Sequence, residues 1–387
     1  MIRSVVDHRR ELHSCAETGF NLPRTRDYLC RCLSESGYKP EIIGQGSVIA
    51  VKRGDIDKYI LLRADMDALT MREQSGLTFA STNGNMHACG HDMHSAMLLS
   101  TAEQLSRQST RCGIIFLFQA AEETLCGARD VIQTGLLSNY DILSAISIHV
   151  LTGIEIPIGT VIIPQGGVVA PGADVIRIDI HGKSAHGSTT NLGKSSIMAA
   201  VNIMENTDRV LNNVLPPSEL RVMNWGKITG GLAANTVAEK TILEGNFRYR
   251  STDERNHFLS RLHKICKASE AITECQINMR LIGGCPPLKN DESIVDLFKR
   301  ELMNKLPRVL AADELGTESN SLGGSDDFSH FCAHIPSVML SLAAGRPSEG
   351  YAEPLHTPKT DFDERSLEIG VSTYKNCIIV IEKSLPN

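Results

Sequence analysis

Gly113-Ile-Ile-Phe-Leu-Phe-Gln119 is the strongest apolar run of the chain, and Ala-Ala-Glu-Glu123 follows it directly. The run has the length of a strand, and an uninterrupted apolar strand is typical of a sheet buried on both faces. Further strands are expected over residues 59–64 and 145–149, and residues 92–105 show helical periodicity. Because strands and helices alternate along this half of the chain, we expect an α/β fold with a mostly parallel sheet covered by helices.

The pattern changes near Gly172, where the sequence takes on the character of an antiparallel sheet. Over residues 174–181, isoleucines alternate with polar residues, as in a strand with one solvent-exposed face. The elements expected next are a helix at 197–211, strands at 220–228 and 240–250, a helix at 253–271 and a strand at 276–281. This order predicts a small α+β domain of the ferredoxin-like kind.

Residues beyond this domain return to the first style, with a helix expected at 294–306 and a strand at 336–341. The α+β domain is therefore expected to be an insertion. We predict one discontinuous domain formed by residues 1–172 and 290–387, interrupted by a second domain at 173–289.

The composition suits an ordinary globular protein, with 387 residues of which 42% are hydrophobic and 22% are charged. A net charge of −6 argues against nucleic acid as a partner, because nucleic-acid binding needs a basic surface. No apolar run reaches the roughly 18 residues of a membrane span, and the charged start of the chain does not read as a secretion signal. The 11 scattered cysteines suit reduced thiols, so we expect a cytoplasmic protein without a membrane partner.

The segment Met86-His-Ala-Cys-Gly-His-Asp-Met-His94 has the composition of a metal site. Cys89 and His91 flank a glycine, so a soft thiolate and a borderline imidazole can turn toward the same transition metal. The alternative is a helix start capped by Asp92, with histidines that bind no metal.

Two adjacent carboxylates, Glu122 and Glu123, follow the apolar strand at 113–119. Adjacent residues of an extended segment point in opposite directions, so one carboxylate can bind a metal while the other faces a metal-bound water. Such a pair is also common in a solvated turn. Because this pair lies where the crevice of an open α/β sheet forms, we expect the edge of a pocket.

Other candidates stand at the ends of expected strands. His149 ends the strand at 145–149 and is either a ligand or a hydrogen-bonded structural histidine. Asp65 and Asp67 follow the strand at 59–64, and they either serve the pocket or cap the next turn.

The C-terminal part of the chain holds two more polar clusters. His356 lies on a proline-stiffened loop ahead of an acidic helix start and can supply a remote ligand. Asp326, Asp327 and His330 follow a glycine-rich stretch, where a local turn or a helix cap is expected.

Taken together, seven segments in the same order resemble the aminoacylase/carboxypeptidase superfamily of dinuclear metalloamidohydrolases, in its branch of hippurate hydrolases and auxin-conjugate hydrolases. The resemblance spans nearly the whole chain. The segments are Arg9-Arg-Glu-Leu-His13, Leu62-Arg-Ala-Asp-Met-Asp-Ala-Leu69 with Glu73, His87-Ala-Cys-Gly-His-Asp-Met-His94, Ala121-Glu-Glu123, Gly182-Lys-Ser-Ala-His186, Gly230-Gly-Leu-Ala-Ala-Asn235 with Gly245 and Arg248, and Leu355-His356 with Phe362-Asp-Glu364.

The resemblance implies a metal-dependent amidohydrolase in which two divalent ions are held by Cys89, His91, Glu123, His149 and His356. Glu122 would be the general base and acid, which takes a proton from the attacking water and later protonates the leaving amine. Asp65 and Asp67 would orient the ligands. Ligands of these types admit Zn, Mn, Co or Ni.

The inserted domain is similar to the lid and dimerisation domain of this family, so a homodimer is expected. The resemblance implies that His186 stabilises the oxyanion of the tetrahedral intermediate. Asn235 and Arg248 would bind the polar end of the substrate, and the guanidinium of Arg248 suits a carboxylate.

We therefore expect hydrolysis of the amide bond of an N-acyl amino acid or a similar small amide. The alternatives are a dipeptidase or carboxypeptidase with the same machinery, and a non-catalytic metal-binding dimer. The chain departs from the family pattern at Asn21-Leu22, Leu69-Thr70, Ser188-Thr-Thr190 and Thr236-Val-Ala238. These departures spare the implied ligands and base, and they concern the preference for the acyl group and the amino acid.

Overall fold

The computed structural model describes residues 3–216, 218–220, 222–314 and 324–386. These residues divide into two compact units. The first contains the described residues of Met1–Val169, Leu288–Leu322 and Asp326–Asn387. The second contains those of Ala170–Pro287 together with residues 324 and 325.

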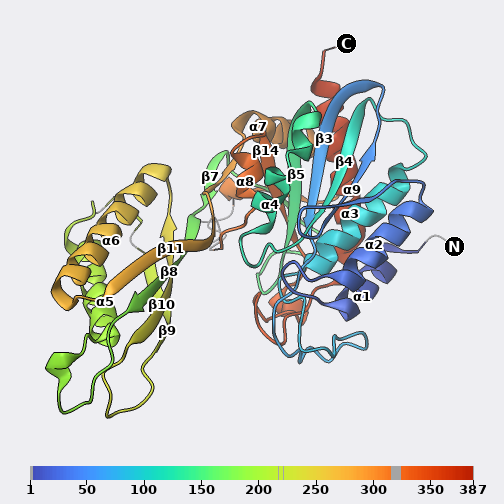
Figure 1. The fold of residues 1–387 in the computed structure, drawn as a ribbon. Helices are drawn as coiled ribbons and strands as arrows, with labels where there is room; N and C mark the ends of the chain where they lie inside the picture. Colours follow the sequence, from blue (N-terminus) through green and yellow to red (C-terminus); the bar gives the residue numbers. More distant parts are fainter. Residues whose placement is uncertain (1–2, 217, 221, 315–323, 387) are drawn as a thin grey trace. The chain divides into compact units, whose positions relative to one another are not determined.

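The first unit is built on an eight-stranded sheet, counted over the described residues (Figure 1). In spatial order its strands are β1 (Glu41–Ile43), β2 (Ser47–Lys52), β4 (Cys112–Gln119), β3 (Ile56–Asp65), β5 (Ile142–Leu151), β14 (Ser337–Ala343), β6 (Val161–Ile163) and β13 (Val309–Ala311). The central strands β4, β3, β5 and β14 are parallel, whereas β2 and β6 pair antiparallel with their central neighbours. The prediction of an α/β fold with a mostly parallel sheet is confirmed.

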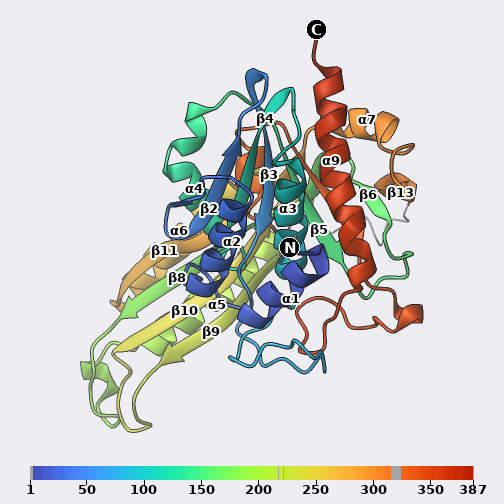
Figure 2. The ribbon, with the colours of Figure 1, turned by 90° about the vertical axis from the view of Figure 1, so that its right-hand side faces the viewer.

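Helices cover both faces of this sheet (Figures 1 and 2). One face carries α1 (Val5–Cys15), α2 (Pro23–Glu35), α3 (His91–Leu105) and α9 (Leu367–Ser384), and the other carries α4 (Gly127–Gln133) and α8 (Ser329–Cys332). Helix α3 is buried on nearly every side because α1, α2 and α9 pack around it above β3. Helix α7 (Glu292–Glu301) packs against β14, β6 and α9. It ends five residues before the expected end at 306, because the chain turns from Leu302 onward.

The described residues also form a small sheet and several short helices. Strands β7 (Gly167–Ala170) and β12 (Leu288–Asn290) form a two-stranded sheet. Short 3₁₀ helices lie at η1 (Leu136–Asn139), η2 (Thr190–Leu192), η3 (Ala312–Glu314), η4 (Pro347–Glu349) and η5 (Glu364–Ser366). In the part of the chain that the structure describes, no helix combines the length and apolar character needed to cross a bilayer.

The second unit is an antiparallel sheet covered by two helices. Its elements are β8 (Gly172–His181), α5 (Ser196–Asn213), β9 (Val222–Gly230), β10 (Lys240–Tyr249), α6 (Thr252–Thr273) and β11 (Gln276–Cys285), and the strands lie in the order β11-β8-β10-β9. The alternating isoleucines of β8 face the helices and pack with Ile203 of α5 and Leu262 of α6. Strand β9 begins later than expected: Leu220 is not part of it, and residue 221 lies outside the described residues.

Candidate metal centre

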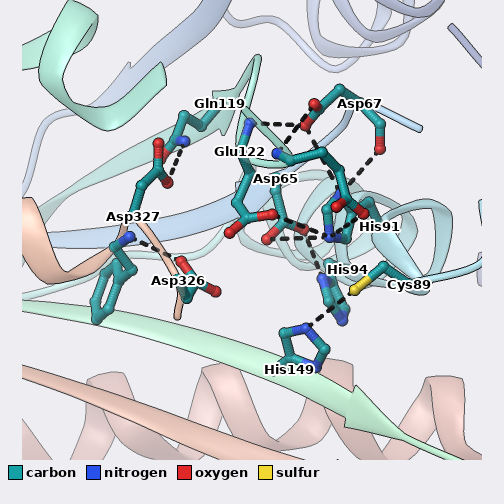
Figure 3. A network of polar contacts seen from close by, with 12 residues as sticks. Asp65, Asp67, Cys89, His91, His94, Gln119, Glu122, His149, Asp326 and Asp327 are labelled. Atoms are coloured by element: carbon teal, nitrogen blue, oxygen red, sulfur yellow. Dashed lines mark hydrogen bonds and ion pairs between the residues drawn. The ribbon is translucent and has the colours of Figure 1, made fainter. Parts of the chain in front are cut away.

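A cluster of polar side chains lies where the central parallel strands of the first unit end (Figure 3). Asp65 is the last residue of β3, Gln119 is the last of β4, and His149 lies near the end of β5. Parallel strands end at the same edge of a sheet, and the loops beyond that edge form the crevice in which such folds bind ligands.

A glycine turn sets the direction of the two candidate ligands at the start of α3. Gly90 is the N-cap residue and has a φ of 89°, which favours glycine. A Cβ atom there would lie 2.3 Å from Cγ2 of Val150. The turn places Cys89 before the helix and His91 as its first residue. The alternative of a helix capped by Asp92 is wrong, because the carboxylate of Asp92 instead accepts hydrogen bonds from other side chains, among them Arg9.

A second strained turn presents the acidic pair after β4. Ala121 has a φ of 57°, which is uncommon for a residue with a side chain, and its N–H donates to the carbonyl of Gly19 at 3.1 Å. Asp67 fixes the next two residues, because its carboxylate accepts from the N–H of Glu122 at 2.9 Å and of Glu123 at 3.3 Å. Asp67 therefore holds the backbone from which both carboxylates project.

The five residues implied as ligands lie close together. Sγ of Cys89 is 3.6 Å from Nε2 of His149, and Nε2 of His91 is 4.0 Å from Oε1 of Glu123. The same Glu123 oxygen is 3.7 Å from Nε2 of His356. The sets Cys89–His91–His149 and Cys89–Glu123–His356 each offer ligand atoms that lie within 4.8 Å of one another, so each could hold a cation.

The loop that carries His356 is strained at that residue. His356 has a φ of 63°, and its N–H donates to the carbonyl of Ala88 at 2.9 Å. The side chain is half exposed, unlike Cys89 and His91, which are buried. A non-glycine residue with positive φ costs roughly 1–2 kcal/mol, and such strain is typical of functional sites.

Two buried atoms at the centre of this cluster have no hydrogen-bond partner among the described residues: Nε2 of His91 and Oε1 of Glu123. Nδ1 of His91 is 2.9 Å from the carbonyl of Asp67, which fixes the ring with Nε2 directed at the carboxylates. Buried polar atoms without partners are rare, and a cation bound between these two would satisfy both. The donor set of thiol, imidazole and carboxylate is also the set that zinc and neighbouring transition metals bind. The residues therefore fit divalent metal ions.

Burial changes the titration of the candidate ligands. It raises the pKa of Cys89 to about 12 and that of Glu123 to about 7, because a charged thiolate or carboxylate is poorly solvated there. Burial lowers the pKa of His149 to about 3, so its lone pair stays available. A cation would favour the charged forms of Cys89 and Glu123, and its binding would release protons.

Glu122 lies beside the ligands and is implied as the base. Its Oε2 is 3.8 Å from Nε2 of His91, and the residue is buried. Burial and the neighbouring carboxylate of Asp326 raise the pKa of Glu122 well above its usual value. A carboxyl group with a raised pKa suits a residue that must both accept and donate a proton near neutral pH.

A buried ion-pair network that we did not predict supports the cluster. The guanidinium of Arg63 in β3 lies 2.7 Å from Asp65, 3.1 Å from Asp327 and 3.3 Å from Asp326. Asp326 does form the expected local turn, in which it accepts from the N–H of Phe328 at 2.7 Å. For Asp327 the expectation of a merely local role is wrong, because this fully buried residue pairs with Arg63 and with the side chain of Gln119. The sequence feature that could have revealed this network is Arg63 itself, a charged residue within the otherwise apolar stretch 59–64 of β3.

The three residues implied for substrate binding lie in the second unit, whereas the ligand cluster lies in the first. His186 and Asn235 are both exposed, and they are neighbours because the N–H of Gly187 donates to the carbonyl of Asn235 at 2.7 Å. Arg248 lies on β10, and its guanidinium donates to the hydroxyl of Ser325.

The chain is similar to known proteins in its sequence and in its fold. The model of Peptidase family M20/M25/M40 matches residues 61–379. An N-acetyldiaminopimelate deacetylase of Bacillus subtilis is 28% identical over 375 residues, which cover 96% of this chain and 96% of the relative. An N-acetyl-L-cysteine deacetylase of the same organism is 31% identical over 339 residues, which cover 86% of this chain and 79% of the relative.

Among solved structures, a Bacillus subtilis protein described as a dinuclear metal binding peptidase of the M20 family is similar to this chain, with a TM-score of 0.75 and 23% sequence identity. The match covers 98% of each chain. An aminobenzoyl-glutamate utilization protein of Klebsiella pneumoniae has a TM-score of 0.74 at 19% identity and covers 97% of this chain and 95% of the other. At these identities the two structures show a shared fold. The family match extends over most of the chain and confirms the resemblance found in its motifs: this chain belongs to Peptidase family M20/M25/M40.

Proposed function

We propose that this protein is a metal-dependent amidohydrolase that cleaves the amide bond of an N-acyl amino acid. The observation that carries the proposal is that five candidate ligand side chains lie close together, with the carboxylate of Glu122 beside them. Among them are Nε2 of His91 and Oε1 of Glu123, which have no hydrogen-bond partner among the described residues. A carboxylate next to a cation site is the arrangement that metal-assisted hydrolysis of an amide requires.

The names of the relatives support the substrate class. The two Bacillus subtilis relatives are deacetylases of N-acetyldiaminopimelate and of N-acetyl-L-cysteine, both of which are small N-acyl amino acids. We propose the same class for this chain, with two divalent ions held by Cys89, His91, Glu123, His149 and His356.

The protein's own groups would act in a defined order. When bound, divalent ions supply the acidification of water and the polarisation of the amide carbonyl. Glu122 accepts a proton from the attacking water at its carboxylate and donates it to the nitrogen of the breaking C–N bond, which leaves as an amine. We assign the oxyanion of the tetrahedral intermediate to His186 and the substrate carboxylate to Arg248, with Asn235 as a further polar contact.

We also propose a homodimer that forms through the second unit. Strand β9 is an edge strand of its sheet, and most of its residues are exposed. Apolar side chains are exposed on this edge strand, at Ile228, and just beyond its end, at Leu232. Met198 of α5 is also exposed. An unpaired edge with apolar neighbours can be covered by the same edge of a second copy.

We propose that the protein is located in the cytoplasm. The 11 cysteines are present as thiols, and eight of them are buried. A reducing compartment preserves thiols of this kind.

The experiment that tests the function is a hydrolysis screen of the purified protein after removal of metal and reloading with Zn, Mn, Co or Ni. Released amino acid is measured with ninhydrin over a panel of N-acetyl, N-benzoyl and longer N-acyl amino acids, with dipeptides as a separate arm. The proposal predicts metal-dependent release from N-acyl amino acids. Release from dipeptides alone would make the protein a dipeptidase, and tight metal binding without any release would favour a binding protein.

A further inference from the structure

We propose that His94 is a positioning residue of the metal centre, whose imidazole holds the end of β5 and thereby the candidate ligand His149. The inference rests on the proposed function, because it assigns His94 a part in the same metal centre. His94 lies on α3, three residues after His91, and its side chain is 1% exposed.

Both ring nitrogens of His94 are occupied by the protein. Nδ1 lies 2.6 Å from Oδ1 of Asp65, and Nε2 accepts a hydrogen bond from the N–H of Val150 at 2.9 Å. A backbone N–H can only donate, so Nε2 carries a lone pair and the ring proton on Nδ1 points at Asp65. Asp65, His91 and His94 offer ligand atoms close enough for a cation, but His94 has no lone pair left for one. His94 thereby differs from His91, whose Nε2 has no hydrogen-bond partner in the part of the chain that the structure describes.

His94 takes the place of a strand partner for β5. The register of β3 with β5 runs as far as the pair Arg63 and Ser147, and β3 ends at Asp65. The N–H of Val150 lies beyond that pairing, and it donates to the imidazole of His94 where a strand carbonyl would otherwise accept. The ring thus ties the end of β5 to the end of β3 through Asp65.

The hydrogen bond to Val150 bears directly on His149. The N–H concerned belongs to the peptide bond between His149 and Val150. The carbonyl of Val150 also lies 2.7 Å from Nδ1 of His149, which leaves Nε2 of that ring facing Sγ of Cys89 at 3.6 Å. The rings of His94 and His149 pack edge to face with their centroids 4.7 Å apart. A shift of Val150 would therefore move both the backbone of His149 and the acceptor that orients its ring.

Asp65 gives His94 a fixed anchor. Its second oxygen pairs with the fully buried guanidinium of Arg63 at 2.7 Å, and its carbonyl accepts from the hydroxyl of Ser95 at 2.7 Å. Hydrogen bonds to the groups that hold metal ligands set the orientation of those ligands, and their loss typically weakens metal affinity roughly 10–100-fold.

Two substitutions separate the two hydrogen bonds of His94. In His94→Asn the side-chain amide reaches the position of Nδ1 and can still donate to Asp65, but nothing accepts from Val150. In His94→Gln the carbonyl reaches the position of Nε2 and can accept from Val150, while the bond to Asp65 is lost. The cobalt dissociation constant of each variant is measured by competition with a chelator, together with the visible absorption spectrum of the cobalt-loaded protein.

The matched control is His8→Asn. His8 is also a fully buried histidine of the first unit with both nitrogens bonded, at 2.8 Å to the hydroxyl of Tyr28 and at 3.1 Å to Glu103. We expect His94→Asn to weaken cobalt binding by roughly 10–100-fold and to alter the spectrum. His94→Gln still accepts from Val150 but has lost its anchor on Asp65, so it should weaken cobalt binding less than His94→Asn does. His8→Asn should lower thermal stability and leave cobalt binding and spectrum as in the wild type.

Three results would overturn the inference: wild-type affinity and spectrum in His94→Asn, equal losses in His94→Asn and His94→Gln, or an equal loss in His8→Asn. Wild-type protein that binds no cobalt would refute the metal centre itself, and with it the role of His94. Wild-type protein that binds cobalt but hydrolyses no amide would refute the proposed reaction, while the three variants would still test the inference.

Discussion

Replacing Gly90 by alanine tests how the turn between Cys89 and His91 is built. A Cβ at this position would lie 2.3 Å from Cγ2 of Val150 and 3.0 Å from Cζ of Phe362. The branched side chain of Val150 has little rotamer freedom, so relief requires movement of β5 beside His149. Overpacking of this kind costs about 1–3 kcal/mol, and the left-handed φ of 89° adds a separate cost.

Gly84→Ala is the matched control because Gly84 has the same φ of 89°, and a Cβ atom added there would meet no atom of the described residues within 4 Å. The backbone cost is therefore common to both variants. Their difference in the free energy of unfolding should be the clash alone, about 1–3 kcal/mol, with Gly90→Ala the less stable. Urea unfolding is followed by far-UV circular dichroism, since the sole tryptophan, Trp225, lies in the second unit.

Gly90→Ala should also weaken metal binding, whereas Gly84→Ala should not. The reasoning would be refuted if both variants lost the same stability, or if Gly90→Ala bound metal as tightly as the wild type.

Three further predictions concern stability. Arg63→Met leaves the buried carboxylates of Asp65 and Asp327 without their cation and should cost about 3–5 kcal/mol in urea unfolding; a loss below about 1 kcal/mol would contradict the network. Burial lowers the pKa of His8, but the nearby Cys32 and Glu103 outweigh burial and raise this pKa to about 9. The stabilisation that His8 contributes is therefore full below pH 6.5 and is lost as the pH rises to 9. The stability difference between wild type and His8→Asn should therefore shrink by up to about 3 kcal/mol over that range, and a pH-independent difference would contradict it. Metal at about 100 times its dissociation constant should stabilise the first unit by about 2.7 kcal/mol, and an unchanged melting temperature after chelation would contradict the fit of the site to metal.

The main elements of the fold could be predicted because their patterns are local. The apolar run at 113–119 became β4, and the alternating isoleucines of 174–181 became β8. Strands β6 and β13 have three residues each, which is too short for a hydrophobic period to show. Strand β6 pairs with the seven-residue strand β14, and β13 in turn pairs with β6.

The residue types of the candidate site could be predicted from the sequence, but the ion pairs and hydrogen bonds that hold those residues in place could not. Cys89 and His91 stand out because their composition is concentrated in one short segment. The pair of Arg63 with Asp327 joins residues 264 positions apart, and no spacing in the sequence reveals such a pair. The same limit applies to His91 and His94, since only their hydrogen bonds distinguish a histidine with a free lone pair from one without.

The central claim is that Glu122 moves the proton in a hydrolysis that the metal centre supports, and Glu122→Gln tests it most directly. Metal content and the rate of N-acyl amino acid hydrolysis are measured on the same preparation as the wild type. We expect unchanged metal content and a rate lower by roughly 10²–10⁴-fold, because glutamine keeps the shape of the side chain and cannot accept the proton. A Glu122→Gln variant that retains both its metal and the wild-type rate would contradict the account.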